Sequence, residues 1–192
     1  MIIKKIRSAI DGNPSEVLKL KLSRVLNNFK SKKIYFTKSK YKEIPIIINN
    51  RNQYTFLKEQ INWFEKNNYN NLIIIDNQST YLPLIDFYNK SKYKILRNQK
   101  NLGYLSLWRT SFYESIKNSH YVYTDPDILP INECPSNFLL YFLDCLNMDK
   151  KLEKIGFGLK IDDITHEDKN FIIKNESKFW QKKILKNNIY YA

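Results

Sequence analysis

The sequence contains few of the residues that build zinc clusters and disulfide frameworks. Its 192 residues include two cysteines, Cys134 and Cys145, and two histidines, His120 and His166. The cysteines form no CxxC pair and no Cys/His cluster, which excludes a zinc site and a disulfide framework. A metal site made of several histidines is excluded as well. We therefore expect two free thiols on or near a buried helix.

Glycine is scarce too, with four occurrences at Gly12, Gly103, Gly156 and Gly158. The sequence has neither the GxGxxG pattern of dinucleotide-binding folds nor the GxxxxGK(S/T) phosphate loop. Both patterns use glycine to let the backbone approach a phosphate closely. Their absence disfavours ordinary Rossmann dehydrogenases and P-loop enzymes.

Long apolar runs are missing from the sequence. No stretch approaches the ~18 to 20 apolar residues that span a bilayer. The opening residues, MIIKKIRS, lack the apolar segment and the cleavage site of a secretory signal. Apolar residues still make up 43% of the chain, enough for the core of one domain of ordinary size. The expected location is the cytoplasm.

Charge is unevenly distributed along the chain. The net charge is +13, and residues 1–44 hold twelve Lys and Arg against three Asp and Glu. Apolar side chains at helical spacing among the lysines of residues 18–29 predict a basic amphipathic helix. We assign residues 1–43 to a basic helical N-terminal segment. It can pack on its own domain, lie on the inner face of an anionic membrane, or pair with another protein. The rest of the chain is only mildly basic, which disfavours nucleic acid as a partner.

From Ile44 onward, short aliphatic runs alternate with helical patterns. Runs of four or five mostly apolar, β-branched residues are typical of buried strands. The patterns predict strands at 44–48, 72–75, 93–96 and 121–124, and helices at 53–66, 82–89 and 103–117. This alternation indicates an α/β fold with a doubly wound, mainly parallel sheet.

Polar side chains follow each of the four predicted strands. They occupy positions 49–51, 76–79, 97–98 and 125–127. Ligands of open α/β sheets bind outside the carboxyl ends of the strands. We therefore expect a binding site at this edge of the sheet.

Asp125-Pro126-Asp127 is the sharpest of these motifs. Two carboxylates one residue apart can converge on a hard cation, Mn²⁺ or Mg²⁺, that prefers oxygen ligands and bridges to substrate phosphates. Pro126 restricts the turn between them. The alternative is a turn and capping pair ahead of a helix near Pro135.

Two further motifs have more than one interpretation. Asp76-Asn77 can hydrogen-bond a nucleobase or a ribose, or can cap the following helix. Gly103, in Asn101-Leu102-Gly103, permits a tight turn close to a ligand. Arg109, in the predicted helix that follows, can neutralise a phosphate or be a surface charge.

Four segments of the chain, residues 46–51, 74–80, 98–104 and 125–127, resemble in order and spacing the motifs of the family 2 glycosyltransferases of the GT-A fold. The resemblance covers residues 44–131 and implies a nucleotide-sugar-binding half there, with a partial acceptor-side half at 132–192. Asn77 departs from the acidic residue that often stands at its position. The implied metal ligands are Asp125 and Asp127, and the implied nucleotide-sugar contacts are Asn49, Arg51, Asp76, Asn77, Asn101, Gly103 and Asp125.

The resemblance implies metal-dependent transfer of a sugar from a nucleotide-sugar, with a UDP-sugar favoured, to a glycan or lipid-linked acceptor, with inversion. A divalent cation stabilises charge on the leaving diphosphate in such a reaction, and the acceptor hydroxyl needs a base. We choose Asp163 as the base; the alternative is an acidic solvated loop. The other candidates considered are Asp162, Glu167 and Asp168. The apolar ending at 189–192 predicts a truncated acceptor-side half.

Two other classes stay open as alternatives. A haloacid-dehalogenase-like phosphatase also has a DxD motif after a strand, but Leu129 stands where that motif has Thr or Val. A non-enzymatic basic module would bind RNA or an anionic membrane through residues 1–44. Buried aliphatic strands do not match an RNA-binding sheet, which exposes aromatic and basic side chains.

Overall fold

The computed structural model describes residues 2–3, 36–148, 152–161, 164–165, 168–180, 183–185 and 189–190. The chain divides into two compact units, Met1–Ile155 and Gly156–Ala192, which are described separately below. The predicted basic helix at 18–29 lies outside the described residues.

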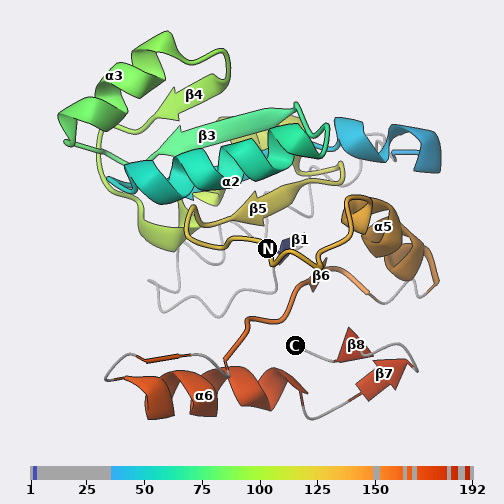
Figure 1. The fold of residues 1–192 in the computed structure, drawn as a ribbon. Coiled ribbons are helices and arrows are strands. Elements are labelled where there is room, and N and C mark those ends of the chain that lie inside the picture. Colours follow the sequence, from blue (N-terminus) through green and yellow to red (C-terminus); the bar gives the residue numbers. More distant parts are fainter. Residues whose placement is uncertain are drawn as a thin grey trace, which may run out of the picture. The chain divides into compact units, whose positions relative to one another are not determined.

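The first unit is an α/β structure built on a mainly parallel sheet. Its parallel strands are β2 (Ile46–Asn50), β3 (Leu72–Asp76), β4 (Lys94–Arg97) and β5 (Val122–Thr124). The sheet has the order β4-β3-β2-β5-β1-β6, in which β1 (Ile2–Ile3) pairs antiparallel with β5 and β6 is Ile155–Gly156. The four predicted strands and the mainly parallel α/β fold are confirmed. The arrowheads of β3, β4 and β5 point the same way in Figure 1.

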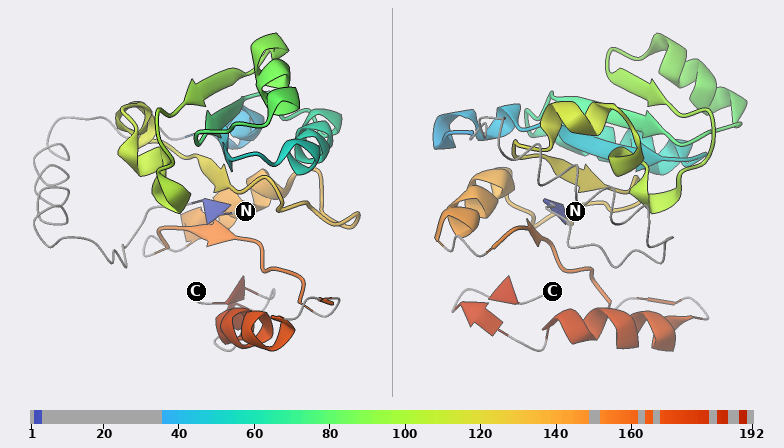
Figure 2. Two further views of the ribbon diagram at one scale, coloured as in Figure 1. Left: turned by 90° about the vertical axis from the view of Figure 1, so that its left-hand side faces the viewer. Right: turned by 180° about the vertical axis from the view of Figure 1, so that it is seen from behind.

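Both faces of the central strands are covered. Side chains alternate between the two faces of a strand, so the consecutive aliphatic residues 46–48 of β2 and 72–75 of β3 require cover on both sides. Helix α2 (Tyr54–Lys66) lies on one face, and residues 103–116 lie on the other (Figures 1 and 2). The core on the second face consists of Ile47, Ile73, Ile75, Leu107, Ile116, Tyr121 and Tyr123. Helix α3 (Leu82–Lys90) follows β3, as predicted for residues 82–89.

The predicted helix at 103–117 is wrong as a continuous element. The structure has two 3-10 turns, η2 (Gly103–Leu105) and η3 (Leu107–Arg109), and a short helix, α4 (Phe112–Ile116). The break has a local cause at Thr110, whose backbone is extended, with φ −99° and ψ 151°. Its hydroxyl donates a 2.7 Å hydrogen bond to the carbonyl of Leu107. A threonine that bonds its own preceding turn competes with helix continuation.

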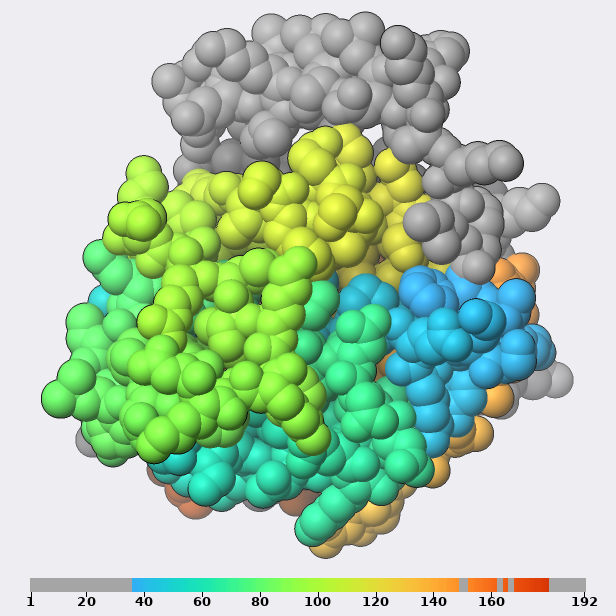
Figure 3. Space-filling view, turned by 90° about the horizontal axis from the view of Figure 1, so that it is seen from above, coloured from blue at the N-terminus to red at the C-terminus, as the bar shows by residue number. Residues whose placement is uncertain are grey.

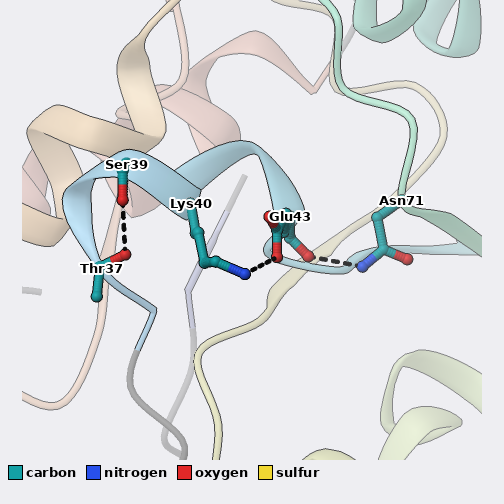
Figure 4. A network of polar contacts seen from close by, with 5 residues as sticks. All are labelled: Thr37, Ser39, Lys40, Glu43 and Asn71. Carbon is teal, nitrogen blue, oxygen red and sulfur yellow. Dashed lines mark hydrogen bonds and ion pairs between the residues drawn. The ribbon is translucent and has the colours of Figure 1, made fainter.

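The start of β2 is fixed by a polar network (Figure 4). Asn71, just before β3, donates 2.7 Å to the carbonyl of Glu43 at the end of η1 (Lys38–Glu43). The backbone N–H of Ile46 donates 2.9 Å to the carbonyl of Asn71. Lys40 also contacts Glu43 at 3.4 Å within η1. These bonds align the first residues of two neighbouring strands, which sets their register.

Strand β4 forms one edge of the sheet and pairs with β3. Figure 3 looks onto this side of the molecule, where β4 and the loop after it, in light green, form the middle of the visible face. Lys94 and Arg97 of β4 are exposed, and charged side chains on an edge strand oppose pairing with other chains.

Helix α5 (Phe138–Met148) completes the first unit. Its Phe138 packs against Trp63 and Tyr69, with ring centroids 6.0 Å and 5.2 Å away. Cys145 is buried in this helix, Cys134 precedes it, and both thiols are free. The predicted free thiols on or near a buried helix are therefore confirmed.

The second unit contains helix α6 (Lys169–Ser177), followed by the turn η4 (Lys178–Trp180). Strands β7 (Lys183–Leu185) and β8 (Ile189–Tyr190) form an antiparallel pair with an irregular register. Among the residues that the structure describes, no helix in either unit has the length and apolar character needed to cross a membrane.

Candidate functional site

The candidate site lies at the carboxyl ends of the parallel strands. Asn50 is opposite Asp76 in the register of β2 and β3, and Asp76 is opposite Arg97 in β4. On the other side of β2, Ile48 is opposite Thr124, which immediately precedes Asp125. The four polar motifs predicted to meet at one edge of the sheet are therefore brought to that edge.

Alternation along β2 directs its last two side chains to opposite faces. Asn49 Oδ1 accepts a 2.7 Å hydrogen bond from Ser106, on the face covered by residues 103–116. Asn50 donates 2.7 Å to the hydroxyl of Tyr88 in α3. The candidate site therefore has two halves, a loop half around Asn49 and a helix half around Asp76.

The loop half is organised by Asn77, which is 3% exposed. Its Nδ2 donates to Asn101 Oδ1 at 2.7 Å and to the carbonyl of Gly103 at 3.1 Å. Its Oδ1 accepts from the backbone N–H of Leu102 at 2.7 Å. Both ends of the amide are engaged with the loop, so Asn77 holds the loop rather than presenting its amide to solvent.

Gly103 is the turning point of this loop. Its φ is +65°, in the left-handed region that glycine adopts without strain. Its N–H donates 2.9 Å to Asn101 Oδ1, and Arg109 Nη1 donates 3.3 Å to the carbonyl of Leu102. Asn101, Gly103 and Arg109 thus share one hydrogen-bonded loop.

A buried hydroxyl connects this loop to β5. Tyr123 donates 2.8 Å to the carbonyl of Tyr104, and its oxygen lies 3.3 Å from Ser106 Oγ. Burial raises the pKa of the Tyr123 hydroxyl well above its ordinary value, and the negative charge of Asp125 adds to the rise. The hydroxyl therefore stays protonated and acts as a donor at neutral pH.

The helix half is organised by Asp76, which is 4% exposed. Its Oδ1 accepts from the backbone N–H of Ser79 at 2.9 Å. Beside it, Asn52 Oδ1 accepts from the N–H groups of Thr80 and Tyr81 at 2.8 Å and 3.0 Å. An open pocket here is lined by Asn52, Thr80, Tyr81, Leu82 and Pro83, and Arg51 beside Asn52 is exposed. The bond to Ser79 closes a local turn after β3, and it does not cap the next helix, because the N-cap of α3 is Tyr81 and receives no side-chain capping bond.

The Asp125-Pro126-Asp127 turn exposes both carboxylate residues and buries Pro126. Thr124 Oγ1 donates 3.1 Å to the carbonyl of Asp125. Gln60, fully buried in α2, donates to the carbonyls of Asp125 and Ile128 at 2.9 Å and 2.7 Å. Sequence reasoning missed Gln60, although its amide interrupts the apolar stripe formed by Leu57, Ile61 and Phe64.

The donor set of this turn fits a hard divalent cation. Asp125 and Asp127 supply carboxylate oxygens, and Mg²⁺ is usually held by one or two carboxylates together with substrate phosphates. Within the described ranges, no three His, Cys, Asp or Glu side chains form a metal-binding group. A cation at this turn would therefore take further ligands from its substrate or from water.

The proposed base is not located by the structure. Asp163, Asp162 and Glu167 lie outside the described residues. Asp168 is exposed and immediately precedes α6 in the second unit. The assignment of Asp163 stays a prediction.

Comparisons with protein-family models, with curated proteins and with solved structures found no match to this chain, so its function is inferred from its own residues and geometry.

Proposed function

We propose that this protein is a metal-dependent glycosyltransferase of the GT-A type, which transfers a sugar from a nucleotide-sugar to a glycan or lipid-linked acceptor with inversion. One observation carries the proposal. The polar ends of β2, β3 and β5 lie side by side at the carboxyl ends of a parallel sheet. The exposed Asp125 and Asp127 lie there on a turn that Gln60 holds through two hydrogen bonds. Ligands of open α/β sheets bind at this edge.

The nucleoside is the part of the donor that the strand ends of β2 and β3 would recognise. Asp76 and the loop after Asn49 offer carboxylate, amide and guanidinium groups to a base and a ribose. Arg51 is exposed beside the open pocket at Asn52. The Gly103 turn brings backbone close to the same edge without a side chain, which leaves room for a ligand.

Asp125 and Asp127 would hold Mn²⁺ or Mg²⁺ together with the diphosphate of the donor. When bound, such a cation supplies Lewis-acid stabilisation of charge on the leaving diphosphate. The protein's own contribution is to hold the two carboxylates on one short turn. Removal of the acceptor proton needs a base within hydrogen-bond reach, a role that we assign to Asp163.

The proposed location is the cytoplasm. Residues 1–44 carry most of the net positive charge of the chain, and contact with the inner face of an anionic membrane would bring a lipid-linked acceptor close. This part of the proposal rests on charge and on the predicted amphipathic pattern.

Thermal stabilisation by ligands tests the proposed donor site. UDP and GDP are each added with and without Mn²⁺ to wild type, to Asp127→Ala and to Glu59→Ala. Glu59 is exposed on α2, so its substitution controls for the loss of one negative charge. Ligand at ~100 times its Kd adds about 2.7 kcal/mol to the stability of a protein that binds it. We expect a Mn²⁺-dependent shift with one nucleotide, retained in Glu59→Ala and lost in Asp127→Ala. No shift with either nucleotide would contradict the proposal.

A further inference from the structure

Gln60 is a polar side chain on the apolar face of α2. Gln60 is fully buried and stands in line with Leu57, Ile61 and Phe64. A buried amide is costly unless its hydrogen-bonding atoms find partners. The contacts of this amide therefore indicate what the residue contributes.

Both contacts of Gln60 go to the turn that carries the two aspartates. Its Nε2 donates to the carbonyl of Asp125 at 2.9 Å and to the carbonyl of Ile128 at 2.7 Å. An amide nitrogen has two hydrogens, and both are used here. The two acceptors also identify the nitrogen, because the amide oxygen in the same place would face two carbonyls. Among the described residues, none donates to Gln60 Oε1.

The turn has little regular structure of its own to hold it. Residues 125–131 follow β5 and belong to no helix or strand. Pro126 has no backbone N–H to donate. The two carbonyls bound by Gln60 lie on either side of Pro126 and Asp127, so the side chain holds the backbone both before and after these two residues. A helix that is itself packed on the sheet thus fixes a turn 65 residues away in the sequence.

We propose that Gln60 is a positioning residue, which holds the Asp125-Asp127 turn in the geometry that binds a divalent cation. This inference rests on the proposed function, because it assigns Gln60 to the metal end of the proposed donor site. Groups that orient metal ligands typically contribute 10- to 100-fold to metal affinity. Gln60 would act through the turn and would not touch the cation.

The test compares Gln60→Met with wild type. Methionine has a similar length and an apolar end, so it fills the same space without donating hydrogen bonds. Tyr69→Phe is the matched control, because Tyr69 is buried and its hydroxyl donates 2.8 Å to the backbone carbonyl of Ser136, away from the turn. Isothermal titration calorimetry gives the affinity for Mn²⁺ at saturating UDP and, separately, the affinity for UDP without metal.

We expect Gln60→Met to bind Mn²⁺ about 10- to 100-fold more weakly than wild type. Its affinity for metal-free UDP should stay unchanged, and Tyr69→Phe should match wild type in both measurements. A loss that was merely structural would appear in both affinities or in both variants. If Gln60→Met does not fold, Gln60→Asn replaces it; its amide is one methylene too short to reach both carbonyls, and the same loss is expected.

The outcomes separate the two proposals. If wild type binds Mn²⁺ with UDP and a folded Gln60→Met binds it equally well, the role of Gln60 is refuted and the proposed function stands. If wild type takes up no Mn²⁺ with any nucleotide, the proposed function fails, and the role of Gln60 falls with it.

Discussion

Asn77 Nδ2 donates a 3.1 Å hydrogen bond to the carbonyl oxygen of Gly103, so the end of β3 holds the loop that turns at Gly103. The same nitrogen donates to Asn101, and the amide oxygen accepts from the N–H of Leu102. An aspartate at this position would lose both donated bonds. The network explains why an amide, and not a second carboxylate, follows Asp76.

Asn77→Asp should lower the free energy of unfolding at pH 7 by about 1 to 3 kcal/mol, because a buried carboxylate would face two oxygen acceptors. The folded-state pKa of this aspartate would lie above its unfolded value. The neutral acid can donate one bond, so stability should be higher below the unfolded pKa and fall as pH rises through the folded pKa. Urea unfolding at several pH values measures the effect. Asn89→Asp is the control, because Asn89 Oδ1 accepts from Arg97 and a carboxylate preserves that bond.

Gly103→Ala should destabilise the protein by about 1 to 2 kcal/mol, because alanine is strained at a φ of +65°. A Cβ at this position would meet no atom within 4 Å, so the backbone conformation and not a clash sets the cost. Gly103→Asn should cost less, since asparagine tolerates the left-handed region better. Chemical denaturation of both variants checks the order; an alanine variant as stable as wild type would refute the assigned turn geometry.

Tyr123→Phe removes the bond from β5 to the carbonyl of Tyr104 and the contact with Ser106. We expect a loss of about 1 kcal/mol in stability, because the substitution removes a hydrogen bond donated by a buried hydroxyl. Tyr81→Phe should change stability little, since Tyr81 is 48% exposed. Equal effects of the two substitutions, measured by urea unfolding, would argue against a special role for the Tyr123 hydroxyl.

The acid stability of the first unit should depend in part on Glu65. The hydrogen bond from Lys92 lowers the pKa of Glu65, and the Tyr93 hydroxyl contributes in the same direction. The ionised form is stabilised in the folded protein, so this contribution is present above the unfolded pKa and is lost as pH falls through the folded pKa. Glu65→Gln should reduce the loss of unfolding free energy at acid pH by less than about 1 kcal/mol, because the pair is partly exposed. An unchanged dependence of the unfolding free energy on acid pH would show that the ion pair contributes nothing.

The sheet could be predicted from the sequence because its signals are local. Four short aliphatic runs are long enough for strands and too short for helices, and the residues between them carry helical periodicity. Parallel pairing then follows from the alternation of strands and helices, and it places the ends of the strands at one edge. Asp76 and Asp125 could be assigned to that edge for this reason.

The loop after Asn101 could not be predicted in the same way. Apolar residues from Leu105 to Ile116 fit a helical pattern, but their packing on the sheet and the Thr110 hydroxyl break the segment into three pieces. The role of Asn77 was likewise hidden, because its partners at 101–103 lie more than 20 residues away in the sequence. Gln60 left a signal, a polar residue inside an apolar stripe, but its acceptors are backbone carbonyls that no side-chain pattern reveals.

The measurement that tests the central claim most directly is Mn²⁺ uptake followed by electron paramagnetic resonance, in which bound Mn²⁺ leaves the signal of the free ion. Wild type and Asp127→Asn are titrated with and without UDP or GDP, with Glu59→Gln as the charge-matched control. The account predicts strong uptake by wild type and by Glu59→Gln in the presence of one nucleotide, and little uptake by Asp127→Asn. Uptake by Asp127→Asn equal to that of wild type, or no nucleotide-dependent uptake by wild type, would contradict it.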